Sequence, residues 1–167
     1  MFKFKTISQK TRRVMSEVAL GNLSNINFEE SCCEKIKTLT NKDEVKICSS
    51  GNNGIFITLS AIKGDIIVPD QGGWHGFKQI AKFLDKNVIT LKTDSGLIEP
   101  NYIDDLDIKE DSALIYTSFA GYCAEQNTKG IAKYCKTNNI LTIEDASAGI
   151  GDNKNKLGRH SDIILAS

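Results

Sequence analysis

Apolar and polar positions repeat in a regular order from about residue 43 to the end of the chain. Short runs of β-branched residues lead into polar or glycine-containing turns, and segments with helical spacing of their apolar residues follow. The strands predicted in this way cover residues 45–48, 65–69, 88–91, 113–117, 140–144 and 162–166. The helices predicted between them cover residues 55–62, 77–84, 101–106 and 125–137.

Strands that alternate with helices indicate an α/β fold with a three-layer, mostly parallel sheet. We assign residues 43–167 to this domain and residues 1–42 to an N-terminal helical segment, in which Asn27 and Glu30 resemble a capping box. Segment 55–62 is ambiguous, because its β-branched residues favour a strand while its place after a helix-opening turn favours a buried helix. We predict the helix.

Composition narrows the classes of function. The 21 basic and 21 acidic residues balance, which argues against nucleic acid or an anionic membrane as the main partner. No apolar run has the length of a membrane span, and Met1–Lys5 lacks the apolar core of a signal peptide, so we expect a cytoplasmic protein. The cysteines contain no C-x-x-C pair, so we predict no metal site and expect buried free thiols. They are Cys32, Cys33, Cys48, Cys123 and Cys135.

The run Ile140–Ile143 leads into Glu144 and Asp145, and then into small residues. We interpret it as a buried parallel strand whose carboxyl end carries an acid. Ligands of open α/β sheets lie outside the carboxyl ends of the strands, which makes Asp145 a candidate binding residue. The alternative is that Asp145 only caps the following turn.

Two glycine-rich turns follow other predicted strands. Ser49–Gly54 opens a helix, so its backbone N–H groups and the positive helix end suit a phosphate, although a plain turn into a helix has the same sequence. It is neither a P-loop nor the G-x-G-x-x-G of a dinucleotide-binding fold. Asp70–Gly76 holds Trp74 and His75 beside glycines, and either ring could stack on a planar ligand. Alternatively, Trp74 packs at the core edge and His75 faces solvent.

In their order along the chain, these motifs resemble the large domain of fold-type-I pyridoxal-phosphate enzymes. The resemblance covers about residues 43–167 and is strongest to the DegT/DnrJ/StrS-type aminotransferases, which act on nucleotide sugars. It implies pyridoxal 5′-phosphate as the cofactor, with Asp145 on the ring nitrogen, Trp74 or His75 stacked on the ring and Ser167 on the phosphate. The implied phosphate-binding turn is Ser50, Gly51, Asn52 and Asn53.

Two positions depart from the family's pattern. The Gln or His that bonds the ring's phenolic oxygen, three residues after the aspartate, is Ala148 here, so Ser147 or Ser118 would have to replace it. The Schiff-base lysine would follow the serine matched by Ser167, where this sequence ends. We therefore expect no transaminase turnover from this chain alone, whether it is a fragment, a truncated product or one half of a split enzyme.

Other classes of function remain open. The chain could be a non-catalytic partner or scaffold subunit of the same fold, or an unrelated nucleotide- or phosphate-binding α/β domain. Stacking by His75 would point to cysteine desulfurases or other lyases. In a complete aminotransferase we expect a small-molecule amino donor and acceptor, the acceptor class including nucleotide sugars. We also expect a homodimer or a complementing second chain.

Overall fold

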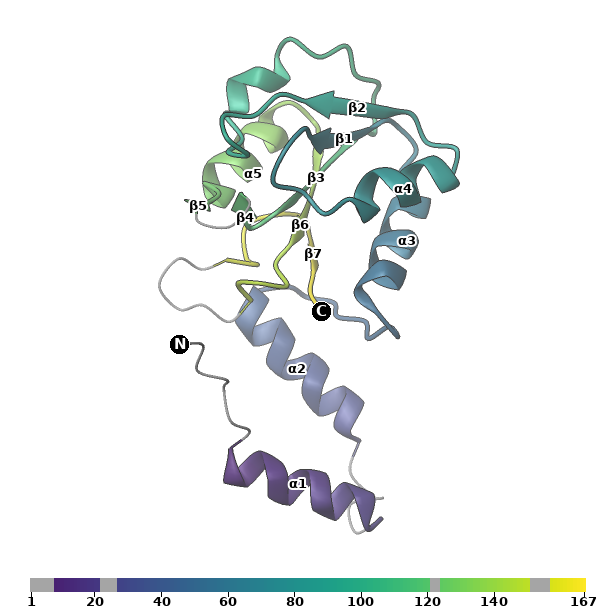
Figure 1. The fold of residues 1–167 in the computed structure, drawn as a ribbon, viewed down its shortest axis with the longest axis vertical. Coiled ribbons are helices and arrows are strands. Elements are labelled where there is room, and N and C mark those ends of the chain that lie inside the picture. The colour runs from purple at the N-terminus through teal and green to yellow at the C-terminus, as the bar shows by residue number, and fades with distance from the viewer. Residues whose placement is uncertain (1–7, 22–26, 121–123, 151–156) are drawn as a thin grey trace.

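A computed structural model describes residues 8–21, 27–120, 124–150 and 157–167. Its centre is a five-stranded sheet in the order β2-β1-β3-β6-β7, and every pair of neighbours is parallel (Figure 1). The strands are β1 Ile66–Pro69, β2 Val88–Leu91, β3 Ala113–Thr117, β6 Leu141–Asp145 and β7 Ile163–Leu165. The predicted parallel α/β sheet is confirmed.

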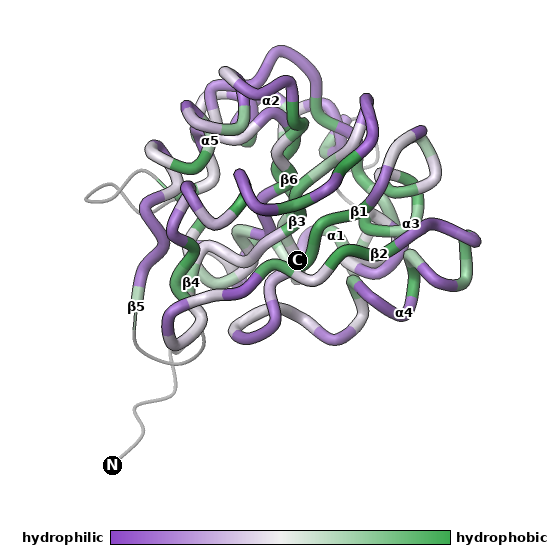
Figure 2. Tube along the Cα trace, turned by 90° about the horizontal axis from the view of Figure 1, so that it is seen from above, coloured by the Kyte–Doolittle hydropathy of each residue, from purple (hydrophilic) through white to green (hydrophobic). Residues whose placement is uncertain are grey.

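Helices cover both faces of the sheet. α3 (Gly51–Ala61) and α4 (Gly76–Phe83) pack on one face, and α5 (Thr128–Thr137) and the 3-10 helix η1 (Pro100–Ile103) pack on the other. Side chains alternate along a strand, so neighbouring residues of β1 serve different cores. Figure 2 shows the apolar tubes of β1 and β3 in the middle of the molecule.

The connections reverse direction between β1 and β3. β1 connects through α4 to β2 on one side, whereas β3 leads through α5 to β6 and then to β7 on the other side. Ligands of open α/β folds bind in the crevice at such a reversal, outside the carboxyl ends of the strands. A short antiparallel pair, β4 (Phe119–Ala120) and β5 (Ala124–Glu125), follows β3 directly at this end.

A buried carboxylate, Asp65, links three segments at the amino end of the sheet, opposite the carboxyl ends of the strands. Asp65 precedes β1 and accepts hydrogen bonds from the Asn87 side-chain amide (3.0 Å) and the Lys109 backbone N–H (3.2 Å). The Lys109 ammonium lies 3.6 Å from the same carboxylate. Burial raises the pKa of Asp65, but these hydrogen bonds and the lysine charge outweigh it, so the pKa lies below its ordinary value.

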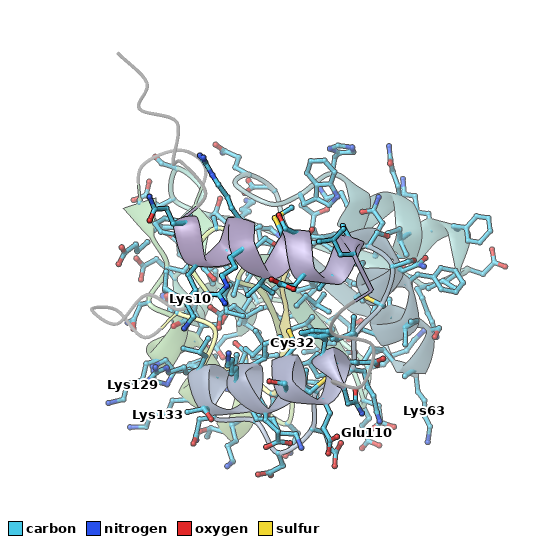
Figure 3. All side chains as sticks on the ribbon, turned by 90° about the horizontal axis from the view of Figure 1, so that it is seen from below. Lys10, Cys32, Lys63, Glu110, Lys129 and Lys133 are labelled. Carbon is cyan, nitrogen blue, oxygen red and sulfur yellow. The ribbon has the colours of Figure 1, made fainter. Side chains whose placement is uncertain are left out.

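Two helices precede the α/β unit. α1 (Gln9–Ala19) and α2 (Phe28–Thr40) lie below the sheet in Figure 1 and in front of it in Figure 3. The Asn27 side chain accepts from the Glu30 N–H at 3.1 Å, which confirms the predicted cap of α2. None of the helices in the described ranges is long and apolar enough to cross a bilayer.

Several sequence predictions need correction. Residues 45–48 do not form a strand, because the segment pairs with no strand in the described part of the chain and leaves Ile47 and Cys48 exposed. Of the helix predicted at 101–106, only residues 101–103 are helical, as part of η1 (Pro100–Ile103). Cys135 is buried as expected, but Cys48 and Cys32 are exposed. Cys123 lies outside the described residues.

Candidate functional site

A cleft of about 830 Å³ opens at the carboxyl end of the sheet. Its walls come from the segments that follow β1, β3, β6 and β7 and from the first turn of α3, so residues far apart in the sequence meet there. Six of the predicted site residues line it: Ser50, Gly51, Asn52, Trp74, Asp145 and Ser167. Asn53 and His75 do not.

The start of α3 presents hydrogen-bond donors to the cleft. Ser50 caps the helix, its hydroxyl oxygen accepting from the Asn53 N–H at 3.2 Å, so the hydroxyl proton is left for another acceptor. Gly51 and Asn52 occupy the first two helical positions, whose N–H groups have no acceptor within a helix. Asn53 has fewer free donors, because one N–H of its side-chain amide is directed at Ser49 and its backbone N–H donates to Ser50.

Ser167 reaches this turn because residue 51 is a glycine. A β-carbon at Gly51 would lie 3.1 Å from the Ser167 Cβ, closer than side-chain carbons normally pack, and 3.4 Å from its hydroxyl oxygen, an ordinary contact. The hydroxyl of Ser167 therefore lies beside the first turn of α3. Figure 1 shows the carboxyl end of β7 near the chain segment that enters this helix.

Trp74 closes the cleft from the loop after β1. Its indole N–H donates to the Asn52 side-chain oxygen at 3.3 Å, so the Asn52 amide keeps its two N–H groups for a ligand. Gly76 makes room for the indole, because a β-carbon there would lie 2.4 Å from the indole nitrogen. The His75 ring lies against Trp74, with ring centroids 4.0 Å apart, and is not part of the cleft wall.

Asp145 divides its two oxygens between the protein and the cleft. Oδ1 accepts from the Ser147 N–H (3.1 Å) and the Ser147 hydroxyl (2.6 Å), so the residue does cap the turn after β6. Oδ2 has no hydrogen bond to any described residue. The turn-capping interpretation therefore holds for Oδ1, and the ligand-binding role of Asp145 stays a prediction for Oδ2.

The floor of the cleft offers acceptors rather than donors. Thr117 donates its proton to the carbonyl of Gly72 (2.7 Å) or of Phe119 (2.6 Å), and Ser118 donates to Glu144 at 2.7 Å. The hydroxyls of Thr117 and of Ser147, which donates to Asp145, therefore offer acceptors at the cleft, whereas Ser118 is almost fully buried and its hydroxyl lies on the Glu144 side. Sequence reasoning overlooked Thr117, although it ends β3 in the way that Asp145 ends β6, so the same strand-end rule would have found it.

No family model and no curated protein matches this sequence, but solved structures match the fold. Aspartate aminotransferase from Thermus thermophilus (a tetra mutant) matches with a TM-score of 0.67 and 16% identity over 86% of this chain and 45% of its own. Ureidoglycine–glyoxylate aminotransferase from Bacillus subtilis matches with a TM-score of 0.64 and 21% identity over 87% and 41% of the two chains. The chain has the α/β fold of fold-type-I pyridoxal-phosphate enzymes.

Mouse CSAD in its apo form matches over 98% of this chain and 44% of its own, with 15% identity and a TM-score of 0.71. The chain therefore spans less than half the length of each of these fold-type-I structures. Identity at this level establishes the fold, and it leaves the chemistry of the cleft to be argued from the residues themselves.

Proposed function

We propose that this chain is the cofactor-binding part of a pyridoxal-phosphate-dependent enzyme of the aminotransferase type. The observation that carries the proposal is the polarity of the cleft, with donors at the start of α3 and acceptors along the ends of β3 and β6. Pyridoxal phosphate matches this polarity, because it has a phosphate at one edge and a ring nitrogen that can carry a proton elsewhere on the ring.

The donor end suits the phosphate. The N–H groups of Gly51 and Asn52 and the hydroxyls of Ser50 and Ser167 supply donors, and the positive end of the α3 dipole lies behind them. Such a site holds a dianion through oriented dipoles, without needing a lysine. A volume of about 830 Å³ falls in the usual range of ligand clefts and leaves space for a substrate beside the cofactor.

At the acceptor end, Asp145 would hold the proton on the ring nitrogen through its free Oδ2. The bound cofactor supplies an electron sink, which is strongest when that nitrogen is protonated. Trp74 would cover one face of the ring and exclude water from it, and its hydrogen bond to Asn52 keeps the indole beside the phosphate end.

The substrates we propose are a small amino donor and a carbonyl acceptor, with nucleotide sugars as one acceptor class. A non-catalytic role as the partner of a second chain is the alternative, and one observation favours it. No lysine is among the described residues that line the cleft, so no described side chain there can attach the cofactor covalently. In a catalytic assembly, a group outside the described residues would supply that attachment, and a homodimer or a complementing chain is the source we propose.

Calorimetric titration of the 167-residue chain with pyridoxal phosphate and with pyridoxamine phosphate tests the proposal. We expect one site that binds both forms reversibly, and no measurable binding of ATP or NADH. A chain that binds a nucleotide but neither vitamin derivative would refute the assignment. We expect the chain alone to show no transaminase turnover, and sustained turnover would disprove the partner-dependent version.

A further inference from the structure

The loop of residues 70–75 carries Trp74 from the end of β1 to the wall of the cleft. Its first residue is tied to the neighbouring strand, because the Asp70 backbone N–H donates to the last carbonyl of β2 at 2.9 Å. α4 begins directly after its last residue. Gly72 and Gly73 lie between these ends, and glycine has the greatest backbone freedom of all residues. The middle of the loop therefore needs a further contact to keep one position.

The contacts of the Trp74 ring itself are too few to fix its place. The side chain is 45% exposed, and its one hydrogen bond, to Asn52, is 3.3 Å long. Most N–H···O bonds in proteins are about 2.9–3.0 Å long, so this bond is a weak one. The His75 ring beside it belongs to the same loop and would move with it. The position of the indole consequently depends on the backbone that carries it.

Thr117, at the end of β3, supplies the contact at the middle of the loop. Its hydroxyl oxygen lies 2.7 Å from the Gly72 carbonyl and 2.6 Å from the Phe119 carbonyl, so its single proton lies between two acceptors. No other described group donates to the Gly72 carbonyl. Thr117 is itself held firmly, because it pairs with Asp145 in the parallel ladder and its side chain is β-branched.

We propose that Thr117 is a positioning residue whose hydroxyl holds the Gly72 carbonyl and thereby keeps Trp74 at the cleft before a ligand arrives. The consequence for binding rests on the proposed function, in which Trp74 covers one face of the cofactor ring. A side chain that is already in place loses less conformational entropy on binding, so affinity is higher. Without the Thr117 proton, the flexible middle of the loop would let the indole leave the cleft wall.

Fluorescence tests the position of the indole in the free chain, because Trp74 is the only tryptophan. Thr117→Val keeps the β-branched shape and removes the donor. In this variant we expect quenching of Trp74 by acrylamide to increase by up to about twofold, since the side chain is already 45% exposed. Thr117→Ser keeps the hydroxyl and should restore the original quenching. Unchanged quenching in Thr117→Val would overturn the inference.

Thr90→Val is the matched control for this substitution. Thr90 is an exposed threonine of the edge strand β2 and does not line the cleft, so we expect its quenching to equal that of the unchanged chain. An increase of the same size in Thr90→Val and Thr117→Val would show a general loosening of the sheet and would overturn the inference.

Calorimetry then measures the effect on the ligand. Thr117→Val should bind pyridoxal phosphate roughly two- to tenfold more weakly, as for the loss of one net hydrogen bond. If Thr117 acts through the indole, the same substitution in a Trp74→Ala background should cause a smaller loss. Equal losses in both backgrounds would show that Thr117 acts on the ligand directly and would overturn the positioning role.

The two readouts separate this inference from the proposed function. If the unchanged chain binds no pyridoxal phosphate, the proposed function fails, and quenching of the free chain still decides whether Thr117 positions Trp74. Urea titration shows whether each variant folds. Should Thr117→Val not fold, Thr117→Ala decides by the same quenching measurement, and quenching equal to that of the unchanged chain would overturn the inference.

Discussion

The indole N–H of Trp74 donates to the side-chain oxygen of Asn52 at 3.3 Å, which links the loop after β1 to the first turn of α3. The two residues are 22 positions apart in the sequence. Because the amide oxygen of Asn52 is occupied, its N–H groups remain for an anion, and the indole is held beside them. One bond therefore orients both the indole and the donor end of the cleft.

Replacing Trp74 with Phe should show what this bond contributes. The variant keeps a ring but loses the donor, so we expect affinity for pyridoxal phosphate to fall roughly two- to tenfold, the usual range for one net hydrogen bond. Calorimetry of Trp74→Phe beside His75→Ala checks the assignment of the stacking residue. A larger loss in His75→Ala would show that the histidine, rather than the tryptophan, covers the ring.

Asp145→Ala should lower the affinity for pyridoxal phosphate more than Trp74→Phe does, because it removes a charge-assisted hydrogen bond. We expect roughly a 10- to 150-fold loss of affinity for pyridoxal phosphate, measured by calorimetry. Asp105→Ala is a suitable control, since that carboxylate is exposed and does not line the cleft. An affinity in Asp145→Ala equal to that of the control would remove Asp145 from the binding site.

Two glycines in the first turn of α3 form a matched pair. A methyl group at Gly54 would make ordinary contacts of 3.4 and 3.5 Å, so Gly54→Ala should stabilise the helix by up to about 1 kcal/mol. The methyl group of Gly51→Ala would displace Ser167. This variant should therefore bind pyridoxal phosphate more weakly, while its affinity for pyridoxal, which has no phosphate, should not change. Equal losses for both ligands would contradict a phosphate site at this turn.

The lowered pKa of Asp65 makes the free energy of unfolding depend on pH under acidic conditions. Because its pKa is lowered in the folded state, its contribution is complete above the ordinary carboxyl pKa, near 4, and declines as pH falls towards the folded pKa. Asp65→Asn should be less stable at pH 7 by about 1–3 kcal/mol. Urea unfolding at a series of pH values should show a shallower loss below pH 4 in this variant. An unchanged acid slope would contradict the assignment.

Exposed cysteine thiols of the folded chain should react faster with an alkylating reagent than buried ones. Burial, with the nearby Asp162 charge, raises the pKa of Cys135 to about 12, so at pH 8 almost none of it is the reactive thiolate. Cys32 and Cys48 are exposed. Alkylation of the folded chain followed by peptide mass spectrometry should label these two and spare Cys135 until denaturant is added. Labelling of Cys135 at the same rate as Cys32 would show that its site opens readily.

Features that depend on neighbouring residues were predictable from the sequence. The strand 113–117 and the Asn27 cap follow from hydrophobic period and cap chemistry, which act over a few positions, and the helix predicted at 55–62 followed from the helix-opening turn before it. The strand-end rule likewise located Asp145 at the cleft wall. Residues 45–48 had the composition of a strand, but a strand also requires a partner, and composition cannot supply one.

The sequence by itself determined the alternation of strands and helices and the residue types at the strand ends, because these arise from local periodicity. Tertiary structure alone decided that Trp74 rather than His75 lines the cleft, and that Ser118 donates inward to Glu144. Ser118 and Glu144 are 26 residues apart, and the direction of a hydroxyl proton depends on which acceptors the fold brings within reach.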